Sequence, residues 1–196
     1  MMSSSNLLKG IVCGIAGTLF ASAAWASDAH VAPMTDFAKV TVKQWISNDT
    51  VIQAVKAQNA KHAGLSQADI DNMDKDWVAQ TGASSKPMID AVLGNAVSQY
   101  LMQQQEASGG VVTEVFVMDN RGLNVGQSEV TSDFWQGDEA KWQKTFQAGA
   151  DGLFIDEVEM DESTQTFQSQ VSMSIVDPAT GEVIGAITVG VNIDAL

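Results

Sequence analysis

The sequence predicts an α+β fold, in which N-terminal helices pack on a five-stranded antiparallel sheet with a helix-bearing crossover. Apolar residues recur at helical spacing in the first half of the chain and alternate at strand spacing in the second half. The last strands are separated by short turns, which favour antiparallel neighbours. We expect one domain with a leader, a helical section and a sheet section, at residues 1–26, 27–110 and 111–196.

The leader has the pattern of a secretory signal peptide. Lys9 supplies the positive charge, residues 11–21 are apolar, and residues 24–26 place alanines at the two positions that a signal peptidase reads. We predict cleavage after Ala26 and a periplasmic location. An uncleaved membrane anchor is the alternative, although the apolar run is shorter than the roughly 20 residues that a spanning helix prefers. The single cysteine, Cys13, lies in the leader, which excludes disulfides and thiolate chemistry from the mature chain.

The chain is strongly acidic, with 24 Asp and Glu against 10 Lys and Arg and a formal charge of −14. We therefore expect neither nucleic acids nor anionic lipids as partners, because both require Lys/Arg-rich faces. Two interpretations of the charge stay open. It keeps an exported protein soluble, or part of it lines a site for a cation, an amine or a metal.

The helical section is expected to start with residues 36–62, where Phe37, Val40, Trp45, Ile52 and Val55 recur at helical spacing. Capping residues at 47–50 predict a break, with a second helix from about Thr50.

Ser66, followed three residues later by Asp69, predicts the start of another helix that reaches about Gln80. Four aspartates cluster there, but the Gly and Glu of a calcium loop are missing, so we expect a solvated helix face. Residues 86–105 are predicted to form a single helix.

The sheet section begins with strands at 111–118 and 123–128, joined by an Asx-and-Gly turn at 119–122. The crossover is the connection between the second and the third strand, and helical structure is expected in it from Gly137 to about Gln147. The remaining strands are predicted at 153–160, 167–176 and 183–193, with a strong turn between the last two.

The order of these elements resembles the Cache family of extracytoplasmic sensors, whose sheet is PAS-like. Residues 115–122 are similar to the family's hydrophobic strand followed by Asp-x-x-Gly, and residues 176–185 to its final turn and strand. The resemblance implies a small-molecule pocket with walls from the second strand, the crossover and the third strand. Amino-acid-binding members show Arg-x-Trp in the crossover and Asp in the last strand. Asp133 and Gly190 stand at those positions here, which counts against an amino acid.

The crossover is the densest functional candidate, because it combines carboxylates with aromatic rings. This combination suits an amine or a quaternary ammonium, since each ring face attracts a cation by about 0.5–2 kcal/mol. Part of it has structural alternatives: Trp142 and Phe146 are expected to face the core, and Asp138 suits a helix start. The predicted ligand-binding residues are Gln127 on the second strand, Asp133, Phe134, Trp135 and Asp138 in the crossover, and Asp156 on the third strand.

Motifs of enzymes are missing from the sequence, which lacks Gly-x-Ser-x-Gly, His-Glu-x-x-His and a Walker loop. We expect no catalytic activity, no cofactor and no metal. The predicted function is extracytoplasmic binding of a small molecule that contributes to signalling, with a membrane receptor or sensor kinase as partner. The alternative is a structural or interaction protein that forms a homodimer through its N-terminal helices.

Overall fold

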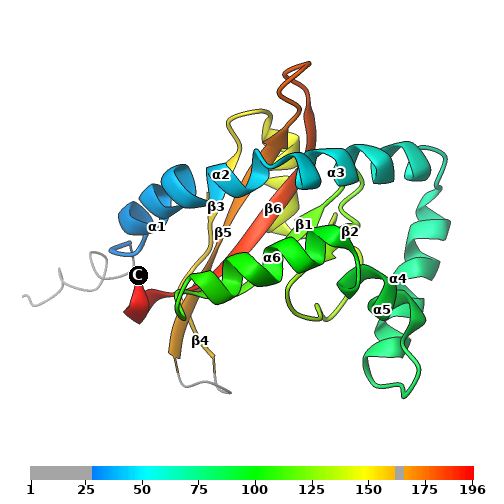
Figure 1. The fold of residues 1–196 in the computed structure, drawn as a ribbon, viewed down its shortest axis with the longest axis horizontal. Coiled ribbons are helices and arrows are strands. Elements are labelled where there is room, and N and C mark those ends of the chain that lie inside the picture. The colour runs from blue at the N-terminus through cyan, green and yellow to red at the C-terminus, as the bar shows by residue number, and fades with distance from the viewer. Residues whose placement is uncertain (1–27, 162–165) are drawn as a thin grey trace, which may run out of the picture.

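The computed structural model describes residues 28–161 and 166–196, so the predicted signal peptide lies outside the described residues. Helices precede an antiparallel sheet, which confirms the predicted fold class (Figure 1). None of the helices in these two ranges is both long and apolar enough to cross a membrane.

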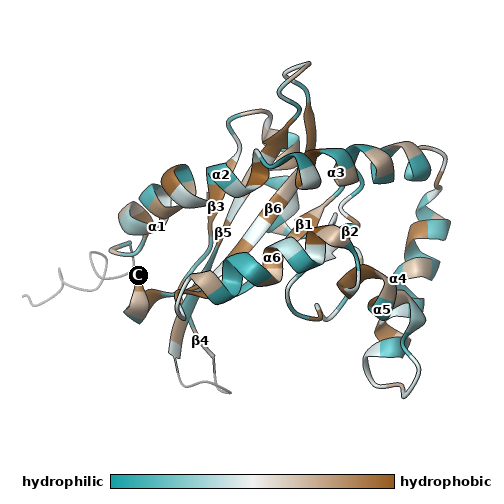
Figure 2. Ribbon diagram, in the orientation of Figure 1, coloured by the Kyte–Doolittle hydropathy of each residue, from teal (hydrophilic) through white to brown (hydrophobic). Residues whose placement is uncertain are grey.

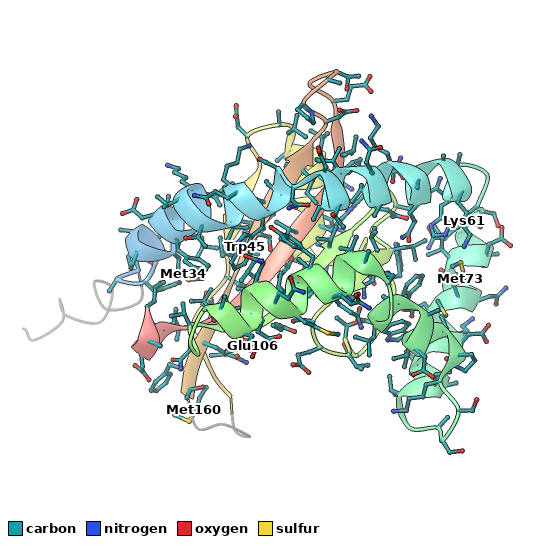
Figure 3. The ribbon with its side chains drawn as sticks, viewed as in Figure 1. Met34, Trp45, Lys61, Met73, Glu106 and Met160 are labelled. Atoms are coloured by element: carbon teal, nitrogen blue, oxygen red, sulfur yellow. The ribbon has the colours of Figure 1, made fainter. Side chains whose placement is uncertain are left out.

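The first helical run starts at Val31, earlier than predicted, and is interrupted where the sequence predicts a break. Asn48 ends the interruption, because its side chain accepts a hydrogen bond from the Thr50 N–H at 2.8 Å and caps the next helix. Met34 and Trp45 point from this run toward the sheet and are buried (Figure 3). The run consists of α1 (Val31–Phe37), a π-helical segment (Ala38–Val42), α2 (Lys43–Ile46) and α3 (Asp49–His62).

Helix α4 (Gln67–Thr81) begins at the predicted capping box of Ser66 and Asp69. The prediction of a single helix over 86–105 is wrong, because the structure has α5 (Pro87–Leu93) and α6 (Ala96–Ala107). Asn95 starts the second of these helices: its side chain accepts from the Ser98 N–H at 2.9 Å.

The sheet has six strands in the described residues, rather than the five predicted. The extra strand arises because the predicted strand at 153–160 leaves the ladder after Ile155 and pairs again only at Glu159. The strand order is β2-β1-β6-β5-β3, with β4 also paired to β5, and every pair is antiparallel. The strands are β1 (Val112–Met118), β2 (Asn124–Gln127), β3 (Leu153–Ile155), β4 (Glu159–Asp161), β5 (Thr166–Val176) and β6 (Val183–Asn192).

The two faces of the sheet are covered by different parts of the chain. Helices α2, α3 and α6 cross in front of the strands in Figure 1, and the main apolar core lies between them and the sheet. Figure 2 shows hydrophobic residues gathered on the strands that these helices cover. The crossover covers the opposite face, but its helix α7 (Ala140–Gln143) is shorter than predicted and is followed by a 3-10 turn (Phe146–Ala148). Trp142 is buried there against Phe116 and Met118.

A second, smaller core joins α4 and α5 to the start of the crossover. Trp77 is fully buried and its indole N–H donates to the Thr131 carbonyl at 2.9 Å, while its ring stacks on Phe134 at 5.2 Å between centroids. Asp74 accepts the backbone N–H groups of Phe134 and Trp135 at 2.8 and 2.9 Å. Helix α4 therefore fixes the first part of the crossover.

Candidate functional site

Part of the crossover face of the sheet is polar rather than apolar. Residues paired directly across antiparallel strands point to the same face. Phe116, which contacts the crossover, pairs with Thr188, and Thr188 pairs with Ser172. Two residues along the strands, the same face carries a row of Glu114, Gly190 and Gln170.

Gly190, which has no side chain, leaves room for the side chains of Glu114 and Gln170 to meet across the last strand. The Gln170 side-chain amide donates to the Glu114 carboxylate at 2.8 Å, across the position of Gly190. A Cβ atom at Gly190 would lie 2.5 Å from Thr113 Oγ1 and 2.7 Å from Glu114 Cγ. A larger residue in the last strand would therefore displace Glu114 from its contact with Gln170.

A cleft of about 240 Å³ lies between the crossover and strand β5 at Gln170, the last residue of this row, and we call it the crossover cleft. It contains four carboxylates and a single ammonium group among the described residues around it, so its charge is negative. Lys141 Nζ lies 2.8 Å from Glu139 Oε2. The residues that line the crossover cleft are Glu139, Lys141, Asp156, Glu157, Glu159, Gln168, Ser169 and Gln170.

One wall of the crossover cleft is the segment between β3 and β4. The Asp156 N–H donates to the Gln170 carbonyl at 2.9 Å, after which the chain leaves the ladder until Glu159 pairs with Gln168. The Asp156 carbonyl accepts from the Ser169 hydroxyl at 2.8 Å and from His30 Nε2 at 3.0 Å. Strand β5 and the residue that precedes α1 thus hold this acidic wall in place.

The other wall is the start of α7. Trp142 fixes this helix, because its indole N–H donates to the Asp119 carbonyl at 3.1 Å and its ring stacks on Phe146 at 4.8 Å. Lys141, the preceding residue, places its ammonium 5.5 Å from the centroid of the Phe116 ring. The wall therefore presents a carboxylate and an ammonium, and the ammonium lies over the buried ring of Phe116 on β1.

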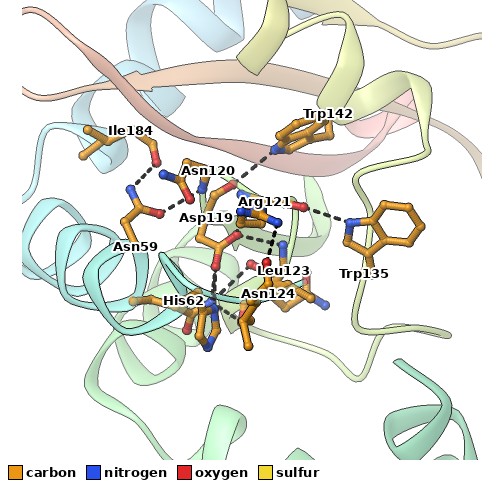
Figure 4. A network of polar contacts seen from close by, with 12 residues as sticks. Asn59, His62, Asp119, Asn120, Arg121, Leu123, Asn124, Trp135, Trp142 and Ile184 are labelled. Atoms are coloured by element: carbon orange, nitrogen blue, oxygen red, sulfur yellow. Dashed lines mark hydrogen bonds and ion pairs between the residues drawn. The ribbon is translucent and has the colours of Figure 1, made fainter. Parts of the chain in front are cut away.

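The turn between β1 and β2 connects this wall to the helices (Figure 4). Asp119 is fully buried, and one carboxylate oxygen accepts the N–H groups of Arg121 and Leu123 at 2.8 and 3.0 Å. The other oxygen lies 2.8 Å from His62 Nδ1 and accepts from Gln58 at 3.0 Å, both on α3.

The same turn also holds Trp135, whose indole N–H donates to the Arg121 carbonyl at 2.8 Å. The Arg121 guanidinium in turn donates to the Leu65 carbonyl at 2.9 Å, beyond the end of α3. The turn therefore ties together the crossover, the first two strands and α3.

Of the six residues predicted from the sequence, the structure brings Asp156 into the crossover cleft. Phe134 is 3% exposed and Trp135 is half-buried, and both pack with the smaller core around Trp77. Asp138 is exposed at the surface. A ligand role for these three side chains stays a prediction.

Gln127 and Asp133 belong to a second polar cluster, beneath the start of the crossover. Asn124 donates to Gln127 Oε1 at 3.1 Å, to Thr131 Oγ1 at 2.8 Å and to the Asp133 carbonyl at 3.3 Å. The Asp133 carboxylate accepts from the Gln136 amide. Asn124 Oδ1 and Gln127 Nε2 are buried and have no hydrogen-bond partner among the described residues.

Sequence reasoning missed Lys141, Gln168 and Gln170 as site residues. The alternation in β5 places Gln168, Gln170 and Ser172 on one face. A polar alternating face is usually solvated, and only the return of the crossover over this strand turns it into the floor of a cleft.

A larger cavity, of about 500 Å³, lies near the chain termini and shares Glu157 with the crossover cleft. Its lining includes His30, Phe167 and Ile193 but no residue of α7. The crossover cleft is the better candidate because the crossover, the segment that follows β3 and strand β5 all line it.

No protein-family model and no curated protein sequence matches this chain. Among solved structures, it is similar to the sensor domain of the V. cholerae histidine kinase DctB, at 16% identity and a TM-score of 0.37, covering 85% of this chain and 58% of that one. The sensory domain of the Campylobacter jejuni chemoreceptor Tlp3 with isoleucine bound is 16% identical, at a TM-score of 0.36, and the coverage is 81% and 62%.

The ligand-binding domain of the Pseudomonas aeruginosa amino acid chemoreceptor PctC, in complex with GABA, is 10% identical at a TM-score of 0.41, and the coverage is 83% and 62%. This chain therefore spans about three fifths of the length of these three domains. All three are sensory or ligand-binding domains of histidine kinases or chemoreceptors. Because the TM-scores are low, these similarities carry no inference about function, which rests on the geometry of the crossover cleft.

Proposed function

We propose that this protein is a Cache-like extracytoplasmic sensor domain that binds a small cation, an amine or quaternary ammonium, in the crossover cleft. The observation that carries the proposal is the excess of carboxylates around the cleft, four against one lysine. An ammonium about 4 Å from one carboxylate at a protein surface gains on the order of 4 kcal/mol of Coulomb energy before desolvation. Several carboxylates around one cleft therefore select strongly for positive charge.

A carboxylate ligand is a poor fit to the same cleft. Lys141, the basic residue in the wall, is already paired with Glu139. Arg121, the single arginine of the sequence, lies at the turn between β1 and β2 and donates to the Leu65 carbonyl. An anion would consequently face four like charges with no free guanidinium beside it among the residues described around the cleft.

The size and polarity of the cleft favour a small polar cation. Its volume of about 240 Å³ lies below the range of about 300–1,000 Å³ typical of sites for drug-sized ligands. Gln168 and Gln170 place side-chain amides along the floor, which suit the hydroxyl or amide groups of a ligand. Among the residues of known placement, no three His, Cys, Asp or Glu side chains converge as they would around a metal ion.

The proposal includes export to the periplasm, with cleavage after Ala26, and a membrane receptor or sensor kinase that responds to the bound state. It includes no catalytic activity. Homodimerisation through the N-terminal helices stays a prediction.

The direct test is to neutralise one carboxylate of the crossover cleft and measure cation binding by isothermal titration calorimetry. With n-butylammonium as the probe, Asp156→Asn is expected to weaken binding about tenfold, a loss of about 1.4 kcal/mol. Asp138→Asn is the matched control, because it removes the same charge from an exposed position of the crossover outside the cleft. Equal weakening by both substitutions would show that the protein attracts cations only through its overall charge.

A further inference from the structure

Lys141 adopts an unusual position for a surface lysine. A lysine side chain normally extends its ammonium into water. The Lys141 side chain is 15% exposed, and its ammonium is bound back against Glu139, which is itself 35% exposed. The same ammonium lies 5.5 Å from the centroid of the Phe116 ring on the sheet.

A carboxylate and an aromatic face are also the two groups by which a protein holds a foreign ammonium. The chain's own ammonium therefore occupies the place that is chemically best suited to a cationic ligand. We propose that Lys141 is a built-in competitor, which occupies the cation subsite of the crossover cleft and is displaced when a ligand binds. This inference rests on the proposed function.

Displacement is geometrically simple, because the anchor of α7 is a different side chain. Trp142 fixes the helix through its bond to the Asp119 carbonyl and its stacking on Phe146. The Lys141 side chain can rotate toward solvent while its backbone stays in place, and the Glu139 carboxylate, which lines the cleft, is then open to the ligand.

Competition from Lys141 determines which cations bind the cleft tightly. A cation such as n-butylammonium exchanges one ammonium for another at the subsite, so the cost of displacing Lys141 lowers its affinity for the wild type. A ligand gains affinity when it also contacts groups that Lys141 does not reach, such as Asp156 or Gln170 on the opposite side of the cleft. Lys141 is thus a residue that selects against the smallest cations.

The test is the affinity of the mature protein for n-butylammonium in the Lys141→Gln variant. If Lys141 competes for the subsite, its removal is expected to tighten binding at least fivefold, whereas Lys141→Arg stays close to the wild-type affinity. Lys144→Gln is the matched control: it removes the same charge three residues further along, where the ammonium lies 4.1 Å from the centroid of the Phe154 ring and does not line the cleft. We expect less than a twofold change there.

Each other outcome overturns the inference. An equal gain in the two glutamine variants would mean that Lys141 acts only through its charge at long range. Weaker binding in Lys141→Gln would mean that Lys141 contacts the ligand. Both results would leave the proposed function intact, whereas a failure of n-butylammonium to bind any variant would contradict the proposed function itself.

Chemical labelling gives a second readout that a merely structural lysine would not change. Saturation with n-butyltrimethylammonium, which has no N–H and cannot itself be acylated, is expected to increase the rate at which an acylating reagent modifies Lys141, because the Lys141 ammonium moves into solvent. The rate at Lys144 should stay the same. Protection of Lys141 by the cation would contradict displacement.

Discussion

At the residue scale, Asp119 combines full burial with several hydrogen-bond partners. Its side chain is fully buried and receives two backbone N–H groups on one oxygen and two α3 side chains, Gln58 and His62, on the other. A carboxylate fits because both of its oxygens accept hydrogen bonds. An amide would place a donor against at least one donor.

Asp119→Asn is therefore expected to lower the free energy of unfolding by about 3 kcal/mol, the scale of a lost hydrogen bond to a charged group plus an unsatisfied buried one. Urea unfolding of the mature protein measures this change. Asp138→Asn, at an exposed position, should change the free energy by less than about 0.5 kcal/mol. A difference between the two variants below about 1 kcal/mol would contradict this view of Asp119.

Only part of this environment could be predicted from the sequence. An Asp three residues before a Gly predicts a turn in which the carboxylate accepts nearby N–H groups, and the structure has that turn. The pairing with His62 could not be predicted, because 57 residues separate the two and only the packing of α3 on the hairpin brings them together.

At the scale of elements, α3 is tied to the turn between β5 and β6 as well as to the turn between β1 and β2, and both turns lie at the same end of the sheet. Lys56 Nζ lies 2.6 Å from a carboxylate oxygen of Asp177, in the turn between β5 and β6. The Lys56 ammonium, together with the Ala179 N–H, holds the pKa of Asp177 below its ordinary value. The pair links the longest hairpin of the sheet to the helical layer.

The lowered pKa gives a pH dependence with a definite sign. The carboxyl group binds a proton more readily in the unfolded chain, where its pKa is about 3.9, than in the folded protein. Its contribution to stability is therefore complete above about pH 5 and is lost as the pH falls through the lower, folded pKa. The difference in urea midpoint between the wild type and Asp177→Asn should shrink between pH 6 and pH 3. A difference that stays constant over this range would contradict the account.

Element boundaries show where local sequence rules fail. The break before α3 and the start of α4 were predictable, because Asn48 and Ser66 cap the helices with their own side chains. The split between α5 and α6 at Gly94–Asn95 carries a similar capping signal, but the apolar stripe continues across it and favours one helix. The split of the third strand depends on contacts from β5 and His30, which no local pattern contains.

At the scale of the whole molecule, acidic residues surround a cleft whose floor is also polar. The sequence predicts the sheet and the crossover, because these follow from periodicity and turn chemistry. It does not distinguish carboxylates that line a cleft from those that face solvent. Glu139 on the crossover and Glu159 on β4 meet Gln170 only through the return of the chain across the sheet.

The measurement that tests the central claim most directly is the thermal shift of the mature protein with three probes of similar size and different charge: n-butylammonium, n-butanol and butyrate. The account predicts that only n-butylammonium raises the melting temperature. At 100 times its dissociation constant it should stabilise the protein by about 2.7 kcal/mol. The shift should diminish as salt is added, because salt screens exposed charges. Stabilisation by butyrate without stabilisation by n-butylammonium would contradict the account.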